Sequence, residues 1–179
     1  MKFLSVSLIC GALAACSPSS QETGRNSTAS SASAQHLPTV PLVVTHGEGG
    51  PPTRLDIEIA LTPEQQETGL MHRTDIAADG GMIFPMLPPR RPSFWMKDTP
   101  TALDILFIRT DGSIAKIVTN TEPNDMTPVF AEVSVAGVLE LRGGAAAALG
   151  IDEGDRISWG ECATERKAPV MEADNFCPA

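Results

Sequence analysis

The segment Ser93–Thr99 could bind a ligand, because it places an indole ring and an ammonium group two residues apart. Its first five residues, Ser93–Lys97, are predicted to form a strand, in which alternate side chains point to the same face. Trp95 and Lys97 therefore share one face, whereas Asp98 follows on the other. An indole beside an ammonium group can hold an apolar ring edge together with an anion. The pattern predicts an amphipathic binding spot.

Two carboxylates within apolar strand sequences are the second unusual feature. Asp104 lies at the start of the apolar stretch Leu103–Ile108, and Glu140 lies between apolar residues in another predicted strand. Carboxylates in such surroundings are rarely buried without a partner. The cations available to pair with them are Lys97, Arg73 and Arg142.

These ionisable groups allow three interpretations. In the first, they form structural ion pairs and hydrogen bonds that hold turns. In the second, they line one polar cleft, as clustered ionisable groups do at functional sites. The candidate binding residues are then Arg73, Trp95, Lys97, Asp98, Asp104 and Glu140. In the third, Asp104 and Glu140 are the acid and base of a hydrolase, a role that requires a specific separation of the two carboxyl groups.

Other motifs that carry chemistry are missing from the sequence. The three histidines, His36, His46 and His72, form no His-x-x-x-His spacing, and no Cys-x-x-Cys is present, so no metal site is expected. There is no Gly-x-Ser-x-Gly motif and no glycine loop for phosphate. Gly143–Gly144 could present backbone amides to an anion, although a plain helix start is the simpler interpretation. We expect no cofactor.

The elements that position these residues follow from local patterns. Apolar and polar residues alternate from Leu55 to Leu61, which predicts a strand with one solvent-facing side. Thr62, Pro63 and Gln65 then form a capping box, which predicts a helix that ends near Gly69–His72. A second, alanine-rich helix is predicted over Gly143–Leu149.

The remaining segments are predicted to be strands and turns. Thr110–Ser113 has the composition of a hairpin turn between two apolar strands, and Pro85–Pro92 is predicted to be a loop. The further predicted strands are Pro41–His46, Met82–Phe84, Leu103–Ile108, Ile114–Val118, Val133–Leu141 and Arg156–Trp159. This pattern predicts an α+β, β-rich fold: a small, partly closed antiparallel β-barrel or curled sheet with two short helices.

The N-terminus is predicted to be a processing signal. Lys2 precedes an apolar run of 11 residues, Phe3–Leu13, which is too short to span a bilayer. The run ends in Leu13-Ala14-Ala15-Cys16, which resembles the lipobox of bacterial lipoproteins. The resemblance implies a signal peptide over residues 1–15, lipidation of Cys16 and stable tethering to a membrane. The alternative is an ordinary signal peptide with a chance cysteine at its end.

The lipobox resemblance also implies a cellular location and domain boundaries. Ser17 replaces the aspartate that would resemble an inner-membrane retention signal. We therefore expect a lipid-anchored, periplasm-facing protein of the cell envelope, at the outer membrane rather than the inner. Residues 16–38 are small and polar, which predicts a flexible linker. A domain over residues 39–160 and a tail over residues 161–179 follow.

The net charge indicates which class of partner is excluded, and the cysteines indicate the redox state of the compartment. The net charge of −9 argues against a nucleic-acid partner, because phosphate contacts need Lys and Arg. Cys162 and Cys177 remain after processing and could close a loop of 16 residues. A disulfide there would stabilise the fold by roughly 3 kcal/mol on the loop-entropy model. Two free thiols are the alternative.

A set of sequence elements occurs in a characteristic order over roughly residues 40–160: Glu64, Gly69–Met71, Arg73, Asp79–Phe84, Phe94–Thr99, Leu103–Phe107, Asp111–Gly112, Val138–Leu141 and Gly150–Asp155. Together these elements resemble the family known as domain of unknown function 192 (DUF192). The resemblance implies a small secreted or envelope domain with a β-rich α+β fold, and no activity. The family commonly has Asn where this chain has Asp98, and often a cysteine pair in the loop after the hairpin. Here Glu122–Pro128 contains no cysteine.

These observations favour a non-enzymatic binding or accessory module, anchored to the membrane through Cys16. Its partner would be a small polar or anionic ligand or an envelope protein, and the tether would raise its local concentration. The alternatives are a hydrolase that uses Asp104 and Glu140, and a purely structural envelope protein. The sequence does not predict the oligomeric state.

Overall fold

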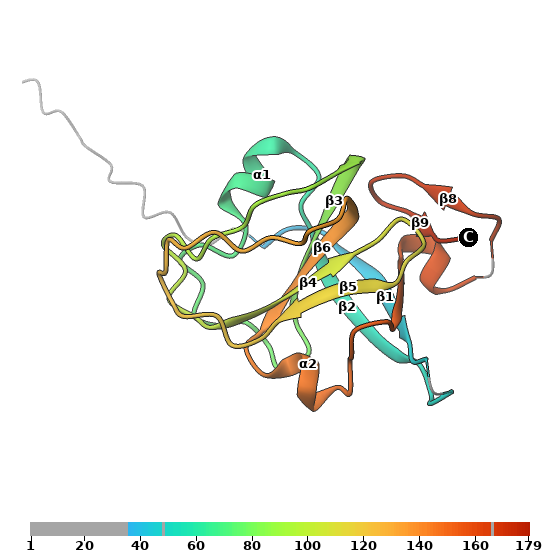
Figure 1. Cartoon of the computed structure of the whole chain (residues 1–179), viewed down its shortest axis with the longest axis horizontal. Coiled ribbons are helices and arrows are strands. Elements are labelled where there is room, and N and C mark those ends of the chain that lie inside the picture. Colours follow the sequence, from blue (N-terminus) through green and yellow to red (C-terminus); the bar gives the residue numbers. More distant parts are fainter. Residues whose placement is uncertain (1–35, 48, 166) are drawn as a thin grey trace, which may run out of the picture. The chain divides into compact units, whose positions relative to one another are not determined.

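The computed structural model describes residues 36–47, 49–165 and 167–179, which form one nine-stranded sheet with short helices (Figure 1). The predicted signal peptide, Cys16 and most of the predicted linker lie outside these residues. Three linker residues, 36–38, are described and lie against the second strand, where the Leu37 amide donates a hydrogen bond to Glu58. Within the described ranges, no helix is long and apolar enough to cross a membrane.

The sheet has the strand order β5-β4-β6-β3-β2-β1-β7-β9-β8. Its elements are β1 Thr39–Thr45, β2 Thr53–Ile59, α1 Pro63–Thr68, β3 Gly81–Arg90, β4 Leu103–Ile108, β5 Ile114–Val118, β6 Val135–Arg142, α2 Ala145–Ala148, β7 Arg156–Trp159, the 3-10 helix η1 Gly160–Ala163, β8 Val170–Met171 and β9 Phe176–Cys177. Neighbouring strands are antiparallel except β2 and β3, which are parallel and joined through α1.

The predicted β-rich class is confirmed in its curled-sheet form. The sheet bends so that an isolated bridge joins Ser113, beside β5, to Arg156 of β7, although these strands are far apart in the strand order. The sheet is not closed, and the barrel alternative is not confirmed. Figure 1 shows α1 and α2 at opposite ends of the curled sheet.

Local signals were reliable where the interaction is short-range. The capping box at α1 is present: the Thr62 hydroxyl accepts from the Gln65 amide, and the Gln65 side chain accepts from the Thr62 amide. The predicted hairpin strands match β4 and β5, and Gly112 has φ 84 in the turn between them. The turn is held by the Asp111 carboxylate, which accepts from the Ser113 amide.

Three predictions differ from the structure, and the first two differ because strand pairing depends on residues far apart in the sequence. The strand β3 continues to Arg90, because beyond Ile83 it no longer pairs with β2 and can accommodate prolines, which lack a donor. Ser93–Lys97 is not a strand, since Phe94 alone forms an isolated bridge, with Val129. The strands β8 and β9 were missed, because two residues are too few for a pattern.

The two faces of the sheet carry separate apolar clusters. One contains Leu42, Ile57, Leu139 and Trp159, and the other contains Met82, Phe84, Ile105, Phe107 and Val138. Both faces of the central strands are therefore buried, and any charged residue in β4 or β6 must be accommodated inside the fold.

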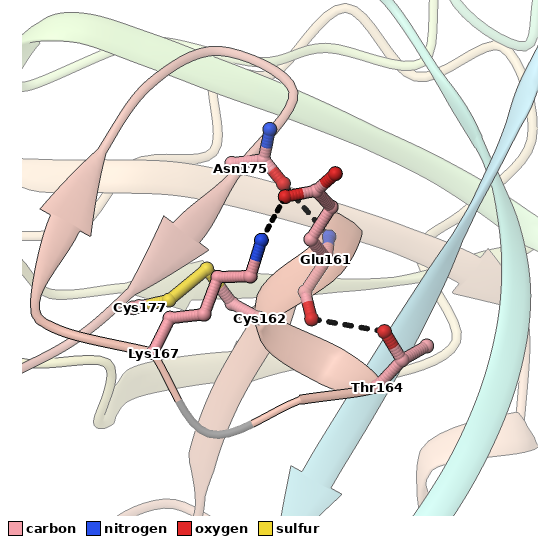
Figure 2. The surroundings of a disulfide bond; sticks show 6 residues. All are labelled: Glu161, Cys162, Thr164, Lys167, Asn175 and Cys177. Carbon is pink, nitrogen blue, oxygen red and sulfur yellow. Dashed lines mark hydrogen bonds and ion pairs between the residues drawn. A yellow bond between two sulfur atoms is a disulfide. The ribbon is translucent and has the colours of Figure 1, made fainter.

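The predicted disulfide between Cys162 and Cys177 is present and joins η1 to β9 (Figure 2). In the same region the Glu161 amide donates to the Asn175 side chain at 2.7 Å, and Lys167 pairs with the Glu161 carboxylate. The Phe176 ring stacks on Trp159 with centroids 4.4 Å apart. The disulfide therefore fixes the tail against β7.

Replacing both tail cysteines with serine is expected to lower the free energy of unfolding by about 3 kcal/mol, because the unfolded chain regains the entropy of an open loop. Denaturant unfolding of the Cys162→Ser/Cys177→Ser variant measures the loss. A reducing agent should destabilise the wild type by the same amount and leave the double variant unchanged. Equal stability of oxidised and reduced wild type would contradict the prediction.

Candidate functional site

A pocket of about 350 Å³ lies between the end of α1, the strand β3 and the loop that follows it. Polar and apolar residues contribute about equally to its walls. The pocket is lined by Gln66, Glu67, Thr68, Gly69, Leu70, Met71, Phe84, Met86, Arg90, Pro92, Ser93, Phe94, Trp95, Lys97, Thr99 and Glu140.

Glu140 forms the polar part of the pocket floor. It lies on β6 opposite Met82 of β3 and Ile105 of β4, and directly paired residues point to the same face of a sheet. The residue is 5% exposed, and among the described residues its carboxyl group has no hydrogen-bond or ion-pair partner. Its oxygens are nevertheless not sealed from solvent. The carboxyl group therefore faces the pocket.

Burial raises the pKa of Glu140 to about 8, because a carboxylate loses its hydration in this apolar floor. At neutral pH the group is therefore largely protonated. A protonated carboxyl can donate one hydrogen bond, and an ionised one can hold a cation. Either state gives the pocket a specific polar contact.

Gly81 allows β3 to lie close to the backbone of Glu140 on β6. A Cβ atom there would collide with the backbone carbonyl of Glu140. The absence of a side chain lets β3 pair with β6 at the point where Glu140 turns towards the pocket. The Gly-Gly-Met-Ile-Phe element thus has a structural role in building the pocket floor.

The rim of the pocket carries the exposed charges. Glu67, Arg90 and Lys97 are exposed, and Trp95 is 48% exposed. Arg90 donates to the Gln66 side chain at 3.3 Å, which connects β3 to α1 across the rim. Both signs of charge are therefore available to a ligand at the pocket opening.

The loop that carries Trp95 and Lys97 is held from below by its alternate residues. The backbone of Phe94 exchanges two hydrogen bonds with Val129, at 2.8 and 2.7 Å. Its ring packs edge-on against Phe84, and Met96 is buried. The alternation that predicted a strand therefore survives in a loop, with apolar residues inward and Trp95 outward.

Asp104 does not belong to this pocket. It pairs with Leu141, so its side chain lies on the sheet face opposite to Glu140. The carboxylate is fully buried and accepts hydrogen bonds from the amides of Asn120, Gly144 and Ala146, at 2.8, 3.0 and 2.9 Å. The amides at the start of α2 do meet an anion, and this anion is the protein's own Asp104.

This geometry corrects two interpretations. Asp104 and Glu140 cannot act on one substrate as acid and base, because the sheet separates them. The expected ion pairs with Lys97, Arg73 or Arg142 are also absent, since no described cation pairs with either carboxylate. Backbone amides satisfy Asp104, and protonation accommodates Glu140.

Arg73 lies in a neighbouring cluster rather than in the pocket. It is 4% exposed and its guanidinium binds both carboxylate oxygens of Glu58, at 2.5 and 2.9 Å. Burial raises the pKa of Glu58, but hydrogen bonds from Arg73, Leu37 and His36 outweigh it and hold the pKa below its ordinary value. Arg73 lines a smaller hollow of about 150 Å³ beside the end of α1.

Asp98 has a backbone role. Its φ of 50 lies in the left-handed region, which Asn and Asp tolerate better than most residues, and its carbonyl accepts from the His72 amide at 2.7 Å. Its side chain is exposed and does not line the pocket.

Of the predicted binding residues, the structure brings together Trp95, Lys97 and Glu140. Sequence reasoning missed the pocket walls from α1 and β3, chiefly Gly69–Met71, Phe84, Met86 and Arg90. A signal for some of them existed, because Gly69–Met71 and Gly81–Phe84 were among the elements that carried the family resemblance. Within the described residues, no group of three His, Cys, Asp or Glu side chains could hold a metal ion.

The family model of DUF192, described as "Uncharacterized ACR, COG1430", matches residues 43–159 of this chain. The chain belongs to the DUF192 family. The match runs from within β1 to the end of β7 and includes every residue that lines the pocket. The family has no established activity in its description, so the pocket has to be interpreted from its own chemistry.

Two solved structures resemble this DUF192 chain. A protein of unknown function from Novosphingobium aromaticivorans DSM 12444 is 41% identical, with a TM-score of 0.65, over 69% of this chain and 86% of that one. A candidate transcription regulator from Sinorhizobium meliloti 1021 is 35% identical, with a TM-score of 0.67, over 71% and 98% of the two chains. No curated protein matches this chain.

Proposed function

We propose that this DUF192 protein is a lipid-anchored module of the bacterial cell envelope that binds a small polar ligand without transforming it. The observation that carries the proposal is the pocket of about 350 Å³, lined by polar and apolar residues alike, into which the buried Glu140 carboxyl group faces. An unpartnered ionisable group in a cleft is costly for stability, and such a cost is typical of functional sites.

The cell-envelope location is supported by two independent features. The short apolar leader ends in Leu13-Ala14-Ala15-Cys16, which resembles a lipobox. The disulfide between Cys162 and Cys177 fits an oxidising compartment outside the cytoplasm. A tether at Cys16 would place the domain at the membrane surface, with the outer membrane as the proposed location.

Binding is favoured over catalysis by the arrangement of the pocket. Among the described lining residues, no second carboxylate lies beside Glu140 on the floor, and no hydroxyl hydrogen-bonds to a base. The Thr99 hydroxyl donates to the Lys97 carbonyl instead. A role on DNA is not part of the proposal, because the chain has a net charge of −9.

Metabolic labelling with palmitate tests the anchor. The wild-type chain should incorporate label, Cys16→Ser should abolish it, and the matched control Cys10→Ser should leave it unchanged. Equal labelling of the wild type and Cys16→Ser would contradict the lipid anchor and with it the envelope location.

Tryptophan fluorescence tests the binding site, because Trp95 lies at the rim and the other tryptophan, Trp159, is buried. The full chain, purified in mild detergent, is titrated with amino acids, amines, sugars, nucleotides and phosphate. A saturable emission change that disappears in Trp95→Phe supports the proposal. If no compound changes the emission or the melting temperature, the binding function is contradicted.

A further inference from the structure

Among the described residues, Glu140 is the buried acid of the pocket floor and has no counter-ion there. Glu140 is 5% exposed, faces the pocket and has no polar partner among the described residues. Most buried carboxylates have polar partners: backbone amides donate to Asp104, and Arg73 pairs with the half-buried Glu58. Because the described residues supply no such partner, a bound ligand is the natural source of one.

The walls around Glu140 are suited to a positive charge. Phe84, Phe94 and Trp95 contribute three aromatic rings, and Met71 and Met86 contribute two thioethers. The face of an aromatic ring carries negative electrostatic potential and attracts organic cations, above all when both are desolvated. Sulfur is polarisable and adapts to ligand shape.

We propose that the pocket binds an organic ammonium ion, with Glu140 as its counter-ion and the aromatic side chains as its walls. The proposal rests on the proposed binding function and names the ligand class for that same site. An ammonium group at the floor leaves the exposed Lys97 and Arg90 free to contact an anionic end of the same ligand at the rim.

Other ligand chemistries fit less well. A free anion would lie against Glu140, whose ionised form would repel it. A hard metal ion needs several oxygen ligands, whereas no described group of three acidic, histidine or cysteine side chains is available. A neutral apolar ligand would leave the carboxyl group without a partner, at the cost of a buried unsatisfied polar group.

The proposal couples binding to proton release. Because burial keeps Glu140 mostly protonated at neutral pH, an ammonium ion must displace that proton. The charged groups that line the pocket with Glu140 are Glu67 of α1, Arg90 of β3 and Lys97 of the loop, and all three are exposed. The directly paired residues on β3 and β4, Met82 and Ile105, carry no charge.

Choline and its uncharged carbon isostere 3,3-dimethylbutan-1-ol are the probes, because they differ in charge and hardly in shape. Isothermal titration of the full chain at pH 8.5 should show choline binding at least tenfold tighter than the alcohol. Glu140→Gln should reduce this preference to less than threefold. The control Glu122→Gln, at an exposed position outside the pocket, should retain it.

The wild type alone supplies a second readout. Choline keeps its charge at all pH values, so its affinity should rise about tenfold per pH unit up to about pH 8 and then level off. The alcohol should show no such rise. This measurement keeps the proposal falsifiable if the Glu140→Gln variant fails to fold.

Equal binding of choline and the alcohol would overturn the ammonium proposal and leave the binding function standing. Loss of the preference in Glu67→Gln instead of Glu140→Gln would also overturn it, because the counter-ion would then be at the rim. Absence of binding by every compound, including the wider panel above, would contradict the proposal and the binding function together.

Discussion

Replacement of Asp104 with alanine is expected to destabilise the domain by about 4 kcal/mol, although Asp104 does not line the pocket. The carboxylate accepts three backbone hydrogen bonds, and bonds to a charged acceptor are stronger than those between neutral groups. Removal leaves the amides of Asn120, Gly144 and Ala146 without this acceptor. The start of α2 and the loop after β5 lose their shared anchor.

Denaturant unfolding measures the effect, with Asp56→Ala as the matched control on the exposed face of β2. The control should change the free energy of unfolding by less than about 0.5 kcal/mol. Asp104→Asn should lie between alanine and wild type, because its amide nitrogen cannot accept a hydrogen bond from the Ala146 amide. A loss below about 1 kcal/mol in Asp104→Ala would contradict the anchoring role.

Replacement of Glu140 with glutamine is expected to remove a pH-dependent cost to stability. The pKa of Glu140 is raised from 4.5 to about 8 by burial, so the folded state binds a proton that the unfolded state has lost. The contribution of this acid to stability is therefore greatest below pH 4.5 and declines as the pH rises towards 8. Glutamine occupies the same space and has no proton to lose.

Between pH 5 and pH 8, the wild type should lose about 3 kcal/mol of unfolding free energy relative to Glu140→Gln. Other titrating groups are common to both proteins and cancel in the comparison. Glu122→Gln, at an exposed loop position, should show a difference that does not change with pH. A flat difference for Glu140→Gln would mean that the carboxyl group titrates normally.

Much of the local structure could be predicted because its causes are close in sequence. The capping box at Thr62 and the turn at Thr110–Ser113 each involve residues within four positions of one another. The tail disulfide followed from the cysteine count once the leader was separated from the domain. In contrast, the length of β3 depends on where β2 stops pairing with it, which no local pattern records.

In the candidate site too, features with a local cause were predicted and features that depend on strand pairing were not. Trp95, Lys97 and Glu140 were found because their residue types are unusual for their surroundings. The role of Asp104 was not predictable, because the sheet register decides that it and Glu140 point to opposite faces. A shift of one residue in the pairing of β4 with β6 would have reversed that relation. The pocket walls from α1 were missed because only the β2-α1-β3 connection places them above β6.

The state of the Glu140 carboxyl group in the wild-type chain is the point on which the account of the pocket depends. Carbon-13 NMR can follow the carboxyl carbon of Glu140 through a pH titration, and the Glu140→Gln variant identifies its signal. The account predicts a midpoint near pH 8 in the free protein, and a lower midpoint when choline is bound. A midpoint near 4.5 that choline does not move would contradict it.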